Sequence, residues 1–127
     1  MRDKLAHITA ADEIWMQRIQ GHPNPIFSRP SEFSSISIWR NRAESIIIKY
    51  EEYLAGLNEE KLLTNVIYKN LKGIEFSTPV WEILMHVANH ATYHRGQVAS
   101  LIRRIKGKPP VTDMIEYFRF TKNSTVF

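Results

Sequence analysis

Three of the five histidines in this sequence lie close together, at His86, His90 and His94, with a separation of four residues each time. In an α-helix this separation places side chains one turn apart on nearly the same face, rotated by about 40°. Two imidazoles one turn apart can bind a single metal ion, and such pairs occur in helical zinc sites. The spacing points to metal chemistry, and a surface helix that carries histidines without function is the alternative.

The helix that carries these histidines is predicted over residues 79–106, with Thr78 as its N-cap and Gly107 behind its end. Its apolar residues follow steps of three and four, and His94 falls within this seam. A buried imidazole is unfavourable unless both of its nitrogens have partners. A metal ion and a second acceptor would supply them, and a core histidine bonded to a hydroxyl or carbonyl is the alternative. The apolar members of the seam are Leu84, Val87, Ala91, Val98, Leu101 and Ile105.

A site built on His90 and His94 needs a third ligand. His7 is the best candidate, because it lies beside the apolar stripe of a helix predicted over residues 2–20, and bundle cores commonly take ligands from facing helices. His86 is the rival, although a stripe that drifts over two turns makes it hard for His86 to share an ion with both other histidines. The residues alone leave the third ligand open.

The remaining segments predict an all-α helical bundle that forms one domain over residues 1–127. A connection over residues 21–34, with Ile26 and Phe27 as anchors, leads to a second long helix over residues 35–57. Residues 59–77 combine a β-prone run with turn-like residues, which predicts a short β-like crossover hairpin before the last long helix. Residues 111–120 are expected to form a short helical turn and a strap across the bundle.

The composition restricts both the ligands and the partners. Cysteine is absent, so a metal site must use nitrogen and oxygen ligands. The net charge of +4 comes from basic residues that are mostly spread out, and those near the end of the last long helix suit its dipole. No apolar run is long enough to cross a membrane, and no signal-peptide pattern is seen. We therefore expect a soluble cytoplasmic protein without a membrane or nucleic-acid partner.

Several motifs together resemble the DinB-like family of metal-dependent four-helix-bundle proteins. The stretch from His86 to Val98, followed by Gly107–Pro110 and Asp113, is similar to the C-terminal signature of this family. The resemblance covers nearly the whole chain. The other motifs that match are Leu5–Ile8 with Ala11, Asp12 and Trp15, then Glu32-Phe33, Tyr68–Asn70 and Gly73.

The resemblance implies an up-down four-helix bundle with a metal site formed by His7, His90 and His94, which excludes His86 as a ligand. Domains of this family usually begin with another long helix before the first histidine motif. The chain is therefore expected to supply three of the four long helices and to leave an apolar groove. We expect a homodimer to cover this groove, and closure by residues 111–127 of the same chain is the alternative.

Relatives of this fold include thiol-dependent transferases and isomerases in which the metal is thought to activate a small thiol. The resemblance implies a divalent-metal-binding protein, with zinc or nickel as the ion, that acts as a thiol transferase or hydrolase on a small molecule. Arg95 is the candidate for binding an anionic substrate, and an ion pair with a carboxylate at a helix end is its alternative role. The alternative function is a non-catalytic, metal-binding dimer associated with stress or DNA damage.

Overall fold

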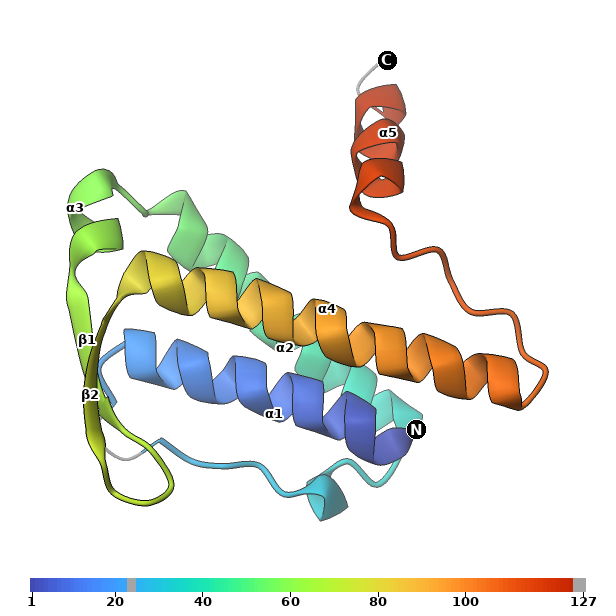
Figure 1. Ribbon diagram of the computed structural model, residues 1–127, viewed down its shortest axis with the longest axis horizontal. Coiled ribbons are helices and arrows are strands. Elements are labelled where there is room, and N and C mark those ends of the chain that lie inside the picture. Colours follow the sequence, from blue (N-terminus) through green and yellow to red (C-terminus); the bar gives the residue numbers. More distant parts are fainter. Residues whose placement is uncertain (23–24, 125–127) are drawn as a thin grey trace.

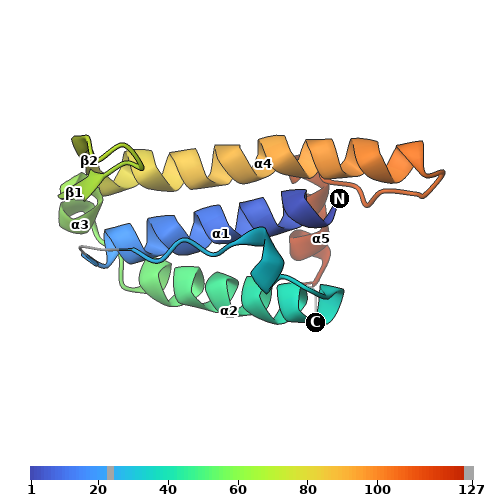
Figure 2. The ribbon, with the colours of Figure 1, turned by 90° about the horizontal axis from the view of Figure 1, so that it is seen from below.

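Three long helices form the body of the molecule in the computed structural model, which describes residues 1–22 and 25–124. Helix α1 (Arg2–Ile19) lies between α2 (Ile36–Ala55) and α4 (Val80–Arg104) and packs against both (Figures 1 and 2). The predicted helical bundle is thereby confirmed, and the ends of these helices agree with the sequence to within two residues. Within the described ranges, no helix is both long and apolar enough to cross a membrane.

The crossover between α2 and α4 contains the predicted hairpin. Strands β1 (Asn65–Lys69) and β2 (Glu75–Pro79) are antiparallel, with Asn65 opposite Pro79. The side chain of Asn70 accepts hydrogen bonds from two backbone N–H groups of the turn, at 2.9 and 3.0 Å. A short helix that the sequence analysis missed, α3 (Glu59–Leu63), precedes the hairpin.

The prediction that Thr78 caps the last long helix is wrong. Thr78 belongs to β2 and lies opposite Val66 in the sheet, where its hydroxyl is 3.3 Å from the hydroxyl of Tyr68. Pro79 is the N-cap residue instead, and α4 begins at Val80 without a side-chain cap. The backbone stays extended for longer than predicted because the ladder with β1 continues to the helix start.

The connection after α1 is anchored by a different residue from those predicted. Ile26 and Phe27 are exposed, whereas the side chain of Phe33 is completely buried. The guanidinium of Arg42 lies 4.5 Å from the centre of the Phe33 ring, and it forms a bidentate ion pair with Glu13 of α1. Phe33 and this ion pair hold the connection against α1 and α2.

Contacts at both ends of α1 fix its position. Near its N-terminus, the indole N–H of Trp39 on α2 donates to the carbonyl of Leu5 and the hydroxyl of Thr9, at 3.1 and 3.0 Å. At the other end, the side chain of Arg18 donates to the carbonyl of Lys69 at 3.1 Å. An apolar cluster formed by Val66, Val80 and Ile83 fills the space between the hairpin, α1 and α4. These contacts fix which side chains of α1 face α4.

The C-terminal segment differs from the strap predicted across the bundle. Residues 105–113 contain no helix or strand, and Pro110 and Thr112 within them border a groove of the helical body. Helix α5 (Met114–Ser124) follows, and it is longer than the predicted helical turn. Figure 1 shows α5 projecting away from the layer of long helices. Pro110 and Thr112 therefore reach the groove, whereas α5 does not cross the bundle.

Candidate metal centre

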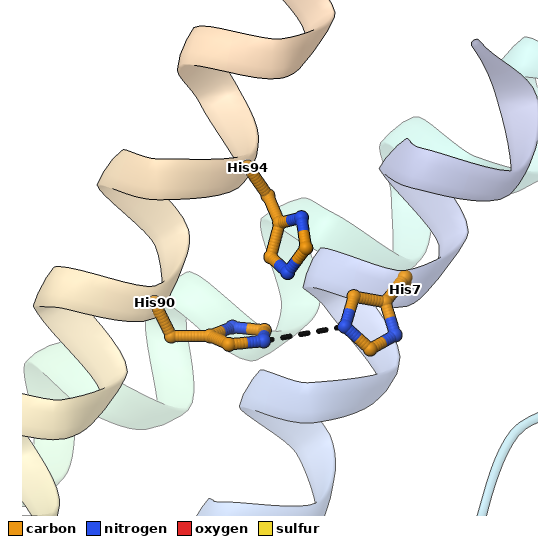
Figure 3. A group of neighbouring side chains, drawn as sticks. All are labelled: His7, His90 and His94. Carbon is orange, nitrogen blue, oxygen red and sulfur yellow. Dashed lines mark hydrogen bonds between the residues drawn. The ribbon is translucent and has the colours of Figure 1, made fainter.

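Three imidazole rings from two helices converge at one point of the body. His7 comes from the first half of α1, and His90 and His94 come from α4 (Figure 3). One ligand nitrogen of each ring lies within 4.8 Å of the other two. The Nε2 atoms of His7 and His90 are 3.2 Å apart, and the ring centre of His94 lies 4.6 Å from that of His7 and 4.5 Å from that of His90. We call these three residues the histidine cluster.

A small side chain on α4 allows the two helices to approach closely at the histidine cluster. Ala91, next to His90, is only 6% exposed, and α1 is the long helix packed against α4. A large side chain at this position would hold α1 and α4 apart and would move the imidazoles out of reach of one another. The His-x-x-x-His spacing then places His90 and His94 on successive turns that face His7.

Comparison with known proteins assigns the chain to a family. The sequence profile of the DinB family matches residues 1–125. The chain belongs to the DinB family. It is also similar to protein DinB of Bacillus subtilis (strain 168), with 33% identity over 73 residues. That alignment covers 57% of this chain and 42% of the relative, so the chain aligns with less than half of the length of the curated relative it matches.

Burial and mutual repulsion keep two imidazoles of this DinB-family chain uncharged. Burial, followed by the charges of His94, His7 and His86, lowers the pKa of His90 to about 4. The pKa of His7 is also lowered, first by burial and then by His94 and Lys4. Both rings are therefore neutral at pH 7, and a neutral imidazole offers the lone pair that metal ligation requires.

The donor set and its dimensions fit one divalent ion. Zinc–nitrogen bonds are about 2.0–2.1 Å long, so two nitrogens of a tetrahedral site lie roughly 3.3 Å apart. The 3.2 Å between the Nε2 atoms of His7 and His90 matches this separation. The full cluster spans 4.8 Å, which small side-chain rotations can close. Neutral nitrogen ligands of this kind suit zinc, nickel, copper or iron.

The second nitrogen of His94 has a partner that the sequence analysis missed. Its Nδ1 lies 2.9 Å from the Oε1 atom of Gln97, which is one turn further along α4. Gln97 follows a candidate ligand by three residues, a spacing that brings the two side chains together on a helix but that many surface glutamines share. His94 is itself 9% exposed, as expected for a member of the helix seam.

His86 lies beside the histidine cluster without joining it. Its ring centre is 5.6 Å from that of His90 and 5.2 Å from that of Trp15, and its side chain is exposed. The structure thus places the rival third ligand against an aromatic side chain at one end of the cluster. Its proximity is the smallest of the causes that lower the pKa of His90.

Arg95 and Asp12 lie on another side of the helix pair. Arg95 donates to the hydroxyl of Thr92 at 2.9 Å, so its hydrogen bond goes to a hydroxyl instead of the predicted carboxylate at a helix end. Both residues line an apolar groove of about 380 Å³ between α2 and α4. The histidine cluster does not border this groove. Arg95, the candidate for substrate binding, therefore points away from the three imidazoles.

Proposed function

We propose that this DinB-family chain binds a divalent metal ion, zinc or nickel, through His7, His90 and His94 and acts as a metal-dependent thiol transferase or hydrolase. The observation that carries the proposal is the convergence of three imidazole nitrogens within 4.8 Å. Two of the rings are uncharged at neutral pH, because burial lowers the pKa of both His7 and His90. The family match supports a shared site but does not identify a reaction.

Three protein ligands are typical of catalytic metal sites, whereas structural zinc sites use four. A divalent ion held by three neutral imidazoles would lower the pKa of a water or thiol bound at an open position and so supply a nucleophile. The neutral imidazoles of His7 and His90 have lone pairs available for a metal ion, and the site is open to solvent. His7 is exposed and His90 is half-buried, so a small molecule can approach from the solvent side.

Activity measurements on the metal-loaded protein test the catalytic half of the proposal. Zinc-loaded and nickel-loaded wild type would be assayed for conjugation of small thiols to an aromatic electrophile and for hydrolysis of activated esters. We expect turnover in one of these assays, and His90→Ala should lose it together with the metal. His86→Ala is the matched control, because it removes a neighbouring imidazole outside the cluster, and it should keep both.

The non-catalytic alternative gives a different result in the same experiment. Wild type that binds one ion per chain but turns over neither class of substrate would leave a metal-binding protein without this chemistry. The role in stress or DNA damage belongs to that alternative and stays a prediction from the family resemblance. The cytoplasmic location likewise stays a prediction from the sequence.

We also propose that a second copy of the chain covers the apolar groove. The groove is formed mainly by aliphatic side chains of α1, α2 and α4, and Ile47 on its rim is 54% exposed. Helix α5 adds further exposed apolar residues, among them Ile115, Tyr117 and Phe118. A stable complex usually buries on the order of 1,600 Å² in total, and a twofold interface would apply the same apolar patch from both subunits.

Sedimentation velocity at low micromolar concentration tests the homodimer. We expect wild type to sediment as a dimer and Ile47→Glu to sediment as a monomer, because a carboxylate on the groove rim would be buried without a partner. Ile48→Glu is the control, since Ile48 is as exposed as Ile47 but does not line the groove. A folded wild-type monomer that binds no hydrophobic dye would contradict the proposal.

A further inference from the structure

His94 differs from the other two members of the histidine cluster in the hydrogen bond of its second nitrogen. Its Nδ1 lies 2.9 Å from Oε1 of Gln97. An amide oxygen accepts hydrogen bonds and cannot donate them, so the Nδ1 of His94 must carry the proton. In a neutral imidazole the lone pair is then on Nε2, which is the nitrogen that points toward His7 and His90 in Figure 3.

The rings of His7 and His90 are held differently. Their Nε2 atoms face each other at 3.2 Å, so in the absence of a metal ion one ring can donate to the other in either direction. Among the described residues, neither ring has a partner for its Nδ1 that would decide between the two tautomers. The orientation of His94 is therefore set from outside the cluster, while those of His7 and His90 are set within it.

We propose that Gln97 is a positioning residue that holds His94 as the Nδ1-protonated tautomer and so directs its Nε2 lone pair toward the other two imidazoles. The inference rests on the proposed metal site, because the purpose of this orientation is ligation. Gln97 is half-buried on α4 next to the buried ring of His94, where water competes weakly for the hydrogen bond. Mutation of a residue that orients a metal ligand in this way typically lowers metal affinity by about 10- to 100-fold.

A purely structural role for Gln97 makes a different prediction. If the amide only satisfied a buried imidazole, its loss would lower the stability of the metal-free protein without altering metal affinity in the folded state. The two roles can therefore be separated by measuring zinc affinity and the tautomer of His94 independently of stability.

Three variants address the role of Gln97. Gln97→Leu removes the acceptor oxygen and keeps a similar volume. Gln97→Glu keeps an acceptor at the same distance and serves as the rescue. Asn89→Leu, at an exposed position of the same helix, is the matched control for placing leucine on α4. Zinc affinity would be measured by competition with a chromophoric chelator, and the tautomer by long-range ¹H–¹⁵N spectra of the metal-free protein.

We expect Gln97→Leu to bind one zinc ion per chain with about 10- to 100-fold lower affinity, and Gln97→Glu and Asn89→Leu to bind it with at least wild-type affinity. In metal-free wild type, the ¹⁵N shifts should show His94 protonated at Nδ1. Wild-type affinity in Gln97→Leu, or an Nε2-protonated His94 in wild type, would overturn the inference. A wild type that binds no metal would instead contradict the proposed function, and its His94 tautomer would still report on Gln97.

Discussion

The contact between α1 and α4 has two sides with opposite chemistry. On one side, His7, His90 and His94 bring three imidazoles within 4.8 Å of one another. On the other side, Asp12 and Arg95 lie in an apolar groove of about 380 Å³. Helix geometry separates the two sides, because five residues along α1 from His7 to Asp12 correspond to a rotation of about 140°.

The two sides also differ in how their polar groups are satisfied. In the histidine cluster each ring faces another ring, and Gln97 supports His94. In the groove, Oδ1 of Asp12 is buried and meets no hydrogen-bond donor among the described residues. Burial accordingly raises the pKa of Asp12 to about 6, although Arg95 opposes the shift. The cluster is arranged to hold a ligand, whereas the groove contains a carboxylate that lowers stability.

Metal binding at the histidine cluster should change the stability of the protein more than any substitution in the groove. A ligand that binds only the native state at 100- to 1,000-fold its Kd stabilises a protein by about 3–4 kcal/mol. We expect zinc to raise the melting temperature of wild type correspondingly and to leave His90→Ala unchanged. Chelation should lower the melting temperature but preserve the helical circular dichroism at room temperature, because the apolar contacts of the helices do not depend on the ion.

That expectation can fail in two ways. Complete unfolding on chelation at room temperature would mean that the ion holds the fold together by itself. An equal zinc effect in wild type and His90→Ala would mean that the ion binds elsewhere, and the distinction between the two sides would be lost.

A smaller effect is expected on the groove side, from Asp12→Asn. The folded pKa of Asp12 is about 6, above the ordinary 3.8, so the folded state binds more protons than the unfolded state between these values. The free energy of unfolding therefore falls as the pH rises from 4 to 6, and ionised Asp12 lowers stability at neutral pH. A neutral amide should stabilise the protein by about 2 kcal/mol at pH 7–8, and this gain should vanish below about pH 4.

Thermal unfolding of Asp12→Asn between pH 4 and pH 8 checks this dependence. Glu44→Gln is the control, because Glu44 is an exposed carboxylate on α2 and its replacement should have little effect at any pH. The zinc affinity of Asp12→Asn should match that of wild type. A loss of zinc binding would show that the groove and the histidine cluster act as one site.

The sequence predicted the long helices and the members of the histidine cluster for identifiable reasons. Spacings of three and four apolar residues mark a helix face, and His94 lay on that face. The choice of His7 over His86 was not decided by periodicity. It came from the family resemblance. Periodicity within one helix cannot show which other helix supplies the third ligand, because that depends on which helices are neighbours and how they are rotated.

Other features depended on tertiary contacts that no local pattern encodes. Phe33, fully buried, lies in a Pro- and Ser-rich connection where Ile26 and Phe27 are equally apolar candidates. Thr78 and Pro79 form a good helix-start signal, yet pairing with β1 keeps them in a strand. The three-residue spacing of His94 and Gln97 allows a hydrogen bond between them on a helix. Glutamine is common on helix surfaces, however, so its presence there does not by itself predict such a bond.

Metal stoichiometry in the purified protein shows which of the four neighbouring imidazoles are ligands. Each protein would be stripped of metal, incubated with zinc, desalted and measured by elemental analysis. The set consists of wild type, His7→Ala, His90→Ala, His94→Ala and His86→Ala. We expect one zinc ion per chain in wild type and His86→Ala, and none in the three variants of the cluster. Loss of zinc in His86→Ala together with full binding in His7→Ala would contradict the assignment of His7 as a ligand.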